Sequence, residues 1–263
     1  MDLQVQDKII LVTGGDSGMG FETAKVLANE GATIVLSDID QQKLDASAQK
    51  LNGNVHTIAA DLRKSGAAQE LADLVQGRIG AVHSVAHFAG TSGASGDFLE
   101  LSDEDWKETL EIDLMGAVRV ARAFIPHMLE NEWGRMLFVA SENALQPYPQ
   151  ETPYNASKAA VTNLSKGLSK AYAEKGVLVN TISPAFVETP MTDKMMQKKS
   201  EELGVSVGEA VDWFLENKRP HIEVNRRGQP EEIAVIAALL CSPLSSYVNG
   251  ANWRIDGGSV ASI

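Results

Sequence analysis

Tyr154 and Lys158 are the pair of residues whose types and spacing best suit catalysis. Their i, i+4 spacing places both side chains on one face of a helix. A tyrosine phenol has a pKa of about 10 and is a poor base at neutral pH, but a neighbouring ammonium favours the phenolate. Such a pair could exchange a proton with an alcohol or a carbonyl oxygen. Tyr-x-x-x-Lys is also common by chance, so the interpretation needs support from other residues.

Ser141 offers a hydroxyl to the same chemistry. It follows the apolar run 135–140, which is typical of a strand, and it precedes Tyr154 by thirteen residues. A hydroxyl at the end of that strand could reach the substrate oxygen that exchanges a proton with the tyrosine.

A glycine-rich turn at residues 13–20, with the sequence TGGDSGMG, could hold a phosphate. Glycine permits positive φ and lets the backbone approach a pyrophosphate. The helix that follows offers free N–H groups and its positive dipole end. The spacing Gly-x-x-x-Gly-x-Gly differs from the dinucleotide fingerprint G-x-G-x-x-G. Because the turn opens a series of strand–helix units, we interpret it as a cofactor site rather than a plain turn.

Asp38 ends the next strand-like run, 24 residues after Gly14. An acid at this place can accept both ribose hydroxyls of an adenosine, and it would repel a 2′-phosphate. Neither the glycine turn nor the immediate neighbours of Asp38 supply a Lys or Arg. The sequence therefore favours NAD(H) over NADP(H). The alternative is that Asp38 only caps the next helix.

These residues are embedded in a regular alternation of strand-like and helix-like segments. The strand-like runs are residues 8–13, 33–37, 55–59, 81–86, 135–140, 177–182 and 253–255; the helix-like segments are 19–29, 40–51, 65–76, 102–130, 153–174 and 230–240. Nearly continuous apolar strands that alternate with helices indicate a parallel sheet covered on both faces. We expect an α/β fold, a Rossmann-like doubly wound parallel sheet of about seven strands, in a single domain over residues 1–263.

Two segments of the chain need separate description. Ser102 and Asp105 resemble a capping box at the start of the long helix 102–130, and Pro126 could kink or end that helix. The alternation breaks between residues 189 and 228, where two helices are expected at 192–203 and 207–217, separated by Gly204. We treat this segment as an insertion into one domain.

Composition excludes several classes of protein. The 263 residues carry a formal charge of −12, which argues against a general nucleic-acid binder and against docking on anionic membranes. The single Cys241 excludes an intrachain disulfide framework and a cysteine-rich zinc site, so no metal is expected. No basic and apolar leader and no apolar run near ~20 residues is present. We therefore expect a cytoplasmic protein.

Together, these motifs resemble those of the short-chain dehydrogenase/reductase family. The matching residues are the 13–20 turn, Asp61-Leu62, Ala89-Gly90, Ser141 with Tyr154-x-x-x-Lys158, Asn180-x-x-x-Pro184 and Asp256-Gly257-Gly258. The resemblance covers nearly the whole chain. It implies hydride transfer between a nicotinamide cofactor and a secondary alcohol or ketone, in a homotetramer.

The resemblance also implies roles for individual residues. Tyr154 would be the general acid/base, Lys158 would hold the nicotinamide ribose and depress the tyrosine pKa, and Ser141 would bond the substrate oxygen. The expected cofactor contacts are Gly14, Ser17, Gly18, Met19, Gly20, Asp38, Asp61, Leu62, Ala89, Gly90, Tyr154, Lys158, Pro184, Val187 and Thr189.

Three positions depart from the family pattern. Residues 87–90 read His-Phe-Ala-Gly where Asn-Asn-Ala-Gly is usual, and His87 either replaces the amide support with a ring N–H or simply packs. Asp113 takes the place of a catalytic Asn. We expect it to keep the main-chain role in a proton relay, to favour charged Lys158 and to oppose the Tyr154 phenolate, which would shift the pH profile. Ala185 replaces the glycine of Pro-Gly, and we expect cofactor binding to survive.

In this family the segment at residues 190–227 covers the substrate, so we expect a helical lid there. The substrate candidates are Ser141, Tyr148, Tyr154, Met191, Met195 and Trp213. The segment 191–227 holds seven basic and seven acidic residues and is formally neutral, so Lys218 and Arg219 could attract an acidic substrate tail locally. The alternative is that these helices only pack on the body or on another subunit.

We predict an NAD(H)-dependent oxidoreductase acting on a secondary alcohol or ketone, within the 3-oxoacyl-reductase-like branch of the family. The alternatives are a 3-oxoacyl-type reductase using NADPH and a cofactor-sensing protein without turnover. Epimerisation or dehydration of a sugar nucleotide is disfavoured, because the chain lacks an additional sugar-binding domain.

Overall fold

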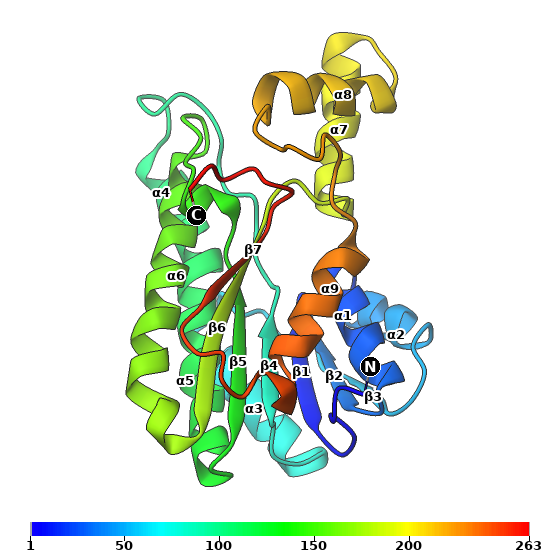
Figure 1. Ribbon diagram of the computed structural model, residues 1–263, viewed down its shortest axis with the longest axis vertical. Helices are drawn as coiled ribbons and strands as arrows, with labels where there is room; N and C mark the ends of the chain where they lie inside the picture. The colour runs from blue at the N-terminus through cyan, green and yellow to red at the C-terminus, as the bar shows by residue number, and fades with distance from the viewer. Residues whose placement is uncertain (1, 263) are drawn as a thin grey trace.

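Within residues 2–262, which the computed structural model describes, seven parallel strands form one sheet (Figure 1). Their order is β3-β2-β1-β4-β5-β6-β7. The strands are β1 (Ile9–Thr13), β2 (Thr33–Ser37), β3 (Val55–Thr57), β4 (Ser84–His87), β5 (Gly134–Val139), β6 (Val177–Pro184) and β7 (Asn252–Ile255). The strand order reverses between β1 and β4, which is where parallel sheets of this kind open a crevice for a ligand. The predicted fold class is therefore confirmed.

The register brings the chemically useful strand ends to one edge of the sheet. Thr13 at the end of β1 is paired with Ser37 on one side and with His87 on the other. His87 is in turn paired with Phe138, three residues before Ser141. Because the strands are parallel, the glycine turn, Asp38 and Ser141 all leave the sheet at the same edge.

Two layers of helices cover the sheet. On one face lie α1 (Gly18–Asn29) and α9 (Pro230–Leu240), with α2 (Gln41–Ala48) at the margin. On the other face lie α3 (Ala67–Arg78), α5 (Gly116–Glu130) and α6 (Thr152–Tyr172). Successive side chains of a strand point to opposite faces of the sheet, and each face has its own apolar core. This is expected for strands that are buried on both sides. Cys241 lies in the core on the α1 and α9 side as a free, buried thiol.

The expected long helix over residues 102–130 is wrong in one respect. It is divided into α4 (Asp103–Leu110), a π-helical turn (Glu111–Met115) and α5. The capping box of Ser102 and Asp105 at the start of α4 is confirmed, and α5 continues past Pro126 to Glu130. Short π-helical turns occur frequently at functional sites, and this one contains Asp113.

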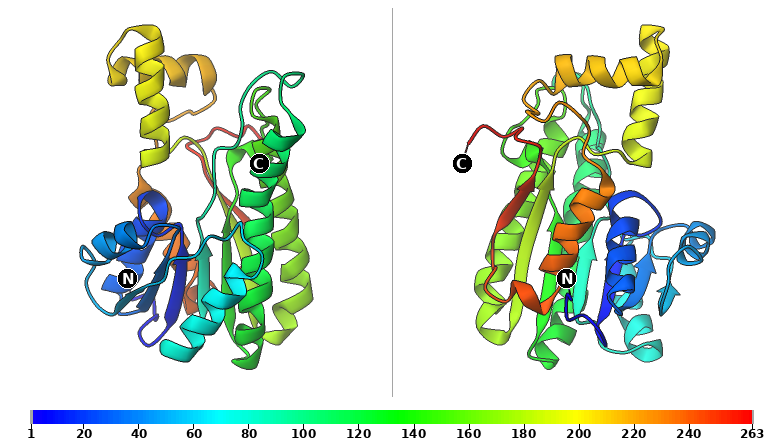
Figure 2. Two further views of the ribbon diagram at one scale, coloured as in Figure 1. Left: turned by 180° about the vertical axis from the view of Figure 1, so that it is seen from behind. Right: turned by 45° about the vertical axis from the view of Figure 1, so that its right-hand side comes forward.

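Helices α7 (Pro190–Leu203) and α8 (Val207–Lys218) stand away from the sheet as a pair (Figure 2). Gly204 ends α7 with a φ of +68°, as the sequence suggested. The pair has a small apolar core of its own, formed by Phe186, Met196, Phe214, Leu215 and Ile222. Among residues 2–262, no helix is both long and apolar enough to cross a membrane.

The core on the α5 side allows a stability test at Phe124, which is fully buried. Phe124→Ala should lower the free energy of unfolding by about 3–5 kcal/mol. The folded state loses the free energy gained by removing the ring from water, and it is further destabilised by the cavity left behind. Urea denaturation measures this change. Leu99→Ala is the control, since that side chain is 89% exposed and its loss should change stability by no more than about 0.5 kcal/mol.

Candidate active site

The glycine turn between β1 and α1 is shaped by close contacts that side chains would prevent. Gly14 has a φ of +66°, and a Cβ there would lie 2.7 Å from the main-chain nitrogen of Ala89. A Cβ on Gly20 would collide with the carbonyl oxygen of Gly14. Gly14 therefore lets the turn approach the chain just after β4, and Gly20 lets the first turn of α1 approach Gly14.

The start of α1 offers unpartnered N–H groups. Ser17 is the N-cap residue, but its side chain caps no helix N–H; it bonds the carboxylate of Asp16 instead at 2.7 Å. No acidic residue occupies the first turn of α1. A helix N-terminus without a side-chain cap is suited to bind a phosphate.

A cavity of about 380 Å³ lies above this turn and the ends of β2 and β4. Among the predicted cofactor contacts it is lined by Gly14, Ser17, Gly18, Met19, Gly20, Asp38, Asp61, Leu62, Ala89, Gly90 and Thr189. It is also lined by residues that the sequence analysis did not assign to the cofactor: Asp16, Ser37, Ile39, Ala60, Arg63, His87, Phe88, Thr91, Ile112 and Pro190. Most of them lie beside the glycine turn, at or after the ends of β2, β3 and β4, or at the start of α7, and these positions are visible in the sequence; Ile112 in the π-helical turn has no such signal.

Four predicted cofactor residues lie outside the lining of this cavity: Tyr154, Lys158, Pro184 and Val187. Pro184 ends β6, and Val187 forms a bridge with Gly228. Lys158 reaches the rim, because its Nζ would lie 3.4 Å from a Cβ placed on Gly90. The same Cβ would lie 2.9 Å from Asp113 Oδ1, so Gly90 permits this close approach. Residue 185 does not have a positive φ, so its backbone conformation accommodates the alanine found there in place of the usual glycine.

Asp38 is half-buried after the end of β2, in the lining of the cavity. Burial raises the pKa of its carboxyl group, and the nearby charge of Asp16 raises it further. Its Oδ1 accepts a hydrogen bond from the N–H of Ile39, whereas the next helix is capped by Asp40. The alternative that Asp38 caps that helix is therefore wrong.

Tyr154 and Lys158 lie one turn apart on α6, on the side that faces the sheet edge. The Nζ of Lys158 is 5.3 Å from the centre of the Tyr154 ring. It donates a hydrogen bond to the carbonyl oxygen of Val139 at 3.2 Å, which fixes the ammonium between β5 and α6. Lys158 is 6% exposed, so its charge needs compensation from the protein.

Asp113 supplies that compensation from the π-helical turn. Its Oδ1 lies 3.7 Å from Lys158 Nζ and accepts a hydrogen bond from the N–H of Thr91 at 2.8 Å. Its Oδ2 accepts a hydrogen bond from the hydroxyl of Ser157 at 3.2 Å. The carboxylate is thus held by the loop after β4, by α6 and by the lysine.

These charges act on the tyrosine in opposite directions. Burial raises the pKa of the Tyr154 phenol, and the carboxylate of Asp113 raises it further; Lys158 and a hydrogen bond with Ser141 lower it. Lys158 therefore acts in the expected direction, but the net shift of the tyrosine pKa is upward. Burial disfavours the Lys158 ammonium, but the negative charges of Asp113 and of ionised Tyr154 outweigh it, so the pKa of Lys158 is raised.

His87 replaces an amide with an imidazole at the end of β4. Its Nδ1 lies 2.7 Å from the hydroxyl of Thr13, which also accepts a hydrogen bond from the N–H of Ala89 at 3.4 Å. Burial, together with the charge of Lys158, lowers the pKa of His87 to about 3, so the ring is neutral. Of the two open interpretations, the geometry favours the one in which the imidazole supports the strand ends by a hydrogen bond.

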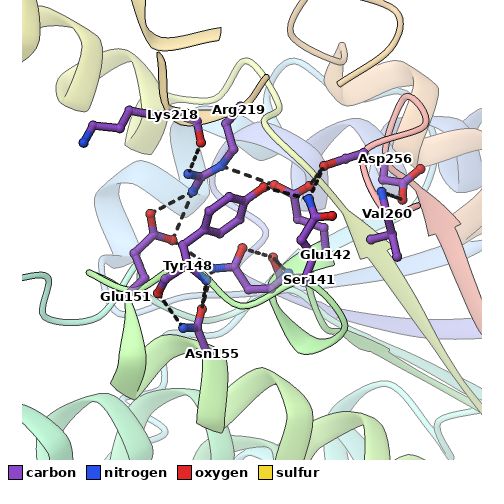
Figure 3. Close-up of polar contacts among 12 residues, drawn as sticks. Ser141, Glu142, Tyr148, Glu151, Asn155, Lys218, Arg219, Asp256 and Val260 are labelled. Carbon is purple, nitrogen blue, oxygen red and sulfur yellow. Dashed lines mark hydrogen bonds and ion pairs between the residues drawn. The ribbon is translucent and has the colours of Figure 1, made fainter. Parts of the chain in front are cut away.

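Ser141 lies two residues after the end of β5, in a polar cluster that links the loop before α6 to the end of α8 (Figure 3). Its hydroxyl bonds Asn143 at 3.1 Å. Tyr148 from the same loop lies under Arg219, whose guanidinium carbon is 3.6 Å from the centre of the ring. Burial raises the pKa of the Tyr148 phenol, and the charge of Glu142 adds to the shift.

The candidate substrate residues on α7 and α8 do not share one environment. Met191 lines the cofactor cavity and is 47% exposed, and Met195 is also exposed. Trp213 packs at the edge of the small core between the two helices, with Lys199 Nζ 5.5 Å from its ring centre. Arg219 is bound by Glu142 and Glu151, so it is not a free cation for an acidic substrate; Lys218 is exposed.

Comparison with known proteins agrees with this geometry. A family model described as enoyl-(acyl carrier protein) reductase matches residues 14–260. The Bacillus subtilis oxidoreductase YvrD is 31% identical over 265 residues, which cover both chains completely. The 3-oxoacyl-[acyl-carrier-protein] reductase FabG of Thermotoga maritima is 31% identical and covers 98% of this chain and 100% of its own. A crystal structure of L-sorbose reductase from Gluconobacter frateurii, with NADPH and L-sorbose, has a TM-score of 0.94 at 29% identity over all of both chains.

The chain therefore belongs to the short-chain dehydrogenase/reductase family. It is an oxidoreductase with a Rossmann-like fold that acts on CH–OH or C=O groups and binds a nicotinamide cofactor.

Asp113→Asn should move the pH profile of alcohol oxidation to lower pH. Without the carboxylate, the pKa of Tyr154 falls, so the phenolate forms at lower pH; the pKa of Lys158 falls as well. The measurement is kcat/KM against pH for several substrates, whose relative values should change little.

Asp73→Asn on the exposed face of α3 is the matched control for this change of charge. An Asp113→Asn profile that coincides with that of the unaltered protein would contradict the electrostatic role of the carboxylate.

Proposed function

We propose that the protein transfers a hydride between NAD(H) and the carbinol carbon of a secondary alcohol or ketone, with Tyr154 as the general acid/base. The observation that carries this proposal is the arrangement of Tyr154, Lys158 and Asp113. The Nζ of Lys158 and the carboxylate of Asp113 lie close to Gly90 in the cavity wall. The Nζ also lies beside the ring of Tyr154.

Each polar group has a separate task in this proposal. Tyr154 takes the proton of the alcohol or returns it to the carbonyl oxygen. Lys158 stabilises the phenolate that forms, because its ammonium is held nearby in a site with little water. Ser141 bonds the same substrate oxygen. Asp113 keeps Lys158 charged and thereby makes the positive charge available when the tyrosine ionises.

The cofactor, when bound, supplies the carbon that accepts or donates the hydride. The glycine turn and the uncapped start of α1 would hold its phosphates. Asp61 and Leu62 would contact the adenine, and Asp38 would accept hydrogen bonds from the adenosine ribose.

The charges around the ribose position support NAD(H). Asp16 and Asp38 both line this part of the cavity. Arg63 is the cationic side chain in the lining described here, and Asp61 binds it with two hydrogen bonds at 2.8 and 2.9 Å. A 2′-phosphate would therefore meet two carboxylates and an arginine that is already paired.

The relatives favour a second candidate, reduction of a 3-oxoacyl group with NADPH. The Thermotoga maritima relative is a 3-oxoacyl reductase, and the sorbose reductase structure contains NADPH. A cofactor-binding protein without turnover is disfavoured, because Tyr154 and Lys158 are both present and close together.

We further propose that residues 190–227 act as a lid over the substrate. Met191 already lines the cofactor cavity, and α7 begins at its rim with Pro190. The exposed thioethers of Met191 and Met195 suit an apolar part of a substrate. The substrate expected here is a small alcohol or ketone, and the homotetramer implied by the family remains a prediction.

Tyr154→Phe should lower the rate of NADH production with an accepted secondary alcohol by about 10²–10⁴-fold, because the proton acceptor is lost. The measurement is NADH absorbance with a panel of secondary alcohols. Tyr247→Phe is the control, since that phenol is fully exposed. Equal, nonzero rates for Tyr154→Phe and the unaltered enzyme would reject the mechanism.

The cofactor preference is tested at Asp38. The enzyme should show a kcat/KM for NAD at least tenfold above that for NADP. A tenfold ratio corresponds to about 1.4 kcal/mol, the order of magnitude expected when a 2′-phosphate replaces a ribose hydroxyl beside Asp38. Asp38→Ala should narrow this ratio, because it removes both the ribose acceptor and the repulsion of the 2′-phosphate. A clear preference of the unaltered enzyme for NADPH would favour the second candidate.

A further inference from the structure

Asn143 holds the hydroxyl of Ser141 from two directions. Its side-chain Oδ1 accepts the Ser141 proton at 3.1 Å, and its main-chain N–H donates to Ser141 Oγ at 3.3 Å. Ser141 and Asn143 are both buried, with exposures of 6% and 4%. These two contacts set the rotamer of Ser141. A hydroxyl has one proton, so it can bond a carbonyl oxygen of the substrate only when that proton leaves Asn143 Oδ1, while the main-chain N–H of Asn143 keeps Oγ in place.

The orientation of the Asn143 amide is itself determined by its other neighbours. The Nδ2 donates to Glu151 Oε2 at 2.8 Å and to Asn155 Oδ1 at 2.8 Å. Asn155 is fixed in turn, because its own Nδ2 donates to the carbonyl oxygen of Tyr148 at 2.8 Å. If the Asn143 amide were reversed, its oxygen would face a carboxylate and a second amide oxygen. Glu151 therefore directs Asn143 Oδ1 toward Ser141.

Glu151 is positioned for this contact rather than for the helix that it begins. It is the N-cap residue of α6, yet its side chain caps no N–H of that helix. Both of its carboxylate oxygens bond Arg219 Nη2, at 2.8 and 3.1 Å, and Oε2 is the atom that also bonds Asn143 (Figure 3). Arg219 thus holds the Glu151 carboxylate beside the amide.

Arg219 is anchored by further contacts with the same loop. Its Nε lies 3.3 Å from Glu142 Oε1, and its guanidinium stacks on Tyr148. Glu142 is buried and also bonds the hydroxyl of Ser259 near the end of the chain. A buried network of this kind is favourable only when all of its members are satisfied, and here it ends at the hydroxyl that the proposed reaction uses.

We propose that Glu151 is a positioning residue for the reaction, acting through Asn143 on the Ser141 hydroxyl, and that Arg219 holds Glu151 in place for it. This inference rests on the proposed function, because it assigns a task to Ser141 in the transfer. Glu151 itself touches neither the substrate oxygen nor the cofactor cavity; its effect passes through one amide. The alternative is that the network only fastens the end of α8 to the loop before α6.

A double-mutant cycle between Glu151→Gln and Ser141→Ala separates these two roles. Glu151→Gln should lower kcat about tenfold, the effect of losing roughly one charge-assisted hydrogen bond, because glutamine can face Asn143 with either end of its amide. In the Ser141→Ala enzyme the same change should lower kcat by less than about twofold, since the group through which Glu151 acts is gone. Rates are compared at the pH where each variant reaches its plateau, because Glu151 also raises the pKa of Tyr154.

Glu104→Gln is the matched control, since that carboxylate is paired with Lys107 at 2.7 Å on the exposed surface of α4. It should leave kcat unchanged. The dissociation constant for NAD should be the same in all variants. Asn143→Ala, combined with Ser141→Ala in a second cycle, gives the same test if Glu151→Gln does not fold.

Equal losses in both backgrounds would overturn the positioning role and leave the proposed reaction standing, because the unaltered enzyme and Tyr154→Phe establish turnover independently. An unchanged kcat for Glu151→Gln would overturn it as well. Absence of turnover by the unaltered enzyme with every alcohol would overturn both proposals.

Discussion

Lys158 and Asp113 form a buried ion pair, and the rest of the site is arranged so that both charges are compensated. An isolated charge there would cost several kcal/mol, so each residue depends on the other and on neutral groups that complete its hydrogen bonds. Those groups come from the loop after β4, from α6 and from the end of β5. The ion pair therefore joins three segments that the sheet only brings near one another, and it determines the charge around Tyr154.

Much of the fold and part of the site could be predicted from the sequence because the signals are local. Apolar runs that end in glycine or aspartate define β1 and β2, and the parallel register then brings Thr13, Asp38 and Ser141 to one edge. The i, i+4 spacing of Tyr154 and Lys158 needs only a helix, which α6 provides. The glycine turn likewise reports its own backbone requirement, which the contacts of Gly14 and Gly20 show.

The remaining features depend on partners that are distant in sequence. The π-helical turn at Asp113 follows a helical pattern that gives no sign of the extra residue. His87 forms a hydrogen bond with Thr13, 74 residues away in the sequence, and Arg219 binds Glu151, 68 residues away. Spacing along the chain cannot show that Arg219 is already neutralised, so the sequence made it a candidate for binding an acidic substrate. Burial likewise reverses the net effect expected on the pKa of Tyr154.

The small core between α7 and α8 makes this pair a packing unit of its own. Its apolar contacts are largely internal, whereas the two cores on the faces of the sheet lie elsewhere. Substitutions within the pair can therefore accumulate without disturbing the packing beneath the glycine turn or α6. Two connections tie the pair to the rest of the site: Arg219 after α8 is bound to Glu151, and Thr189 before α7 lines the cavity, so these two positions limit how far the pair can move.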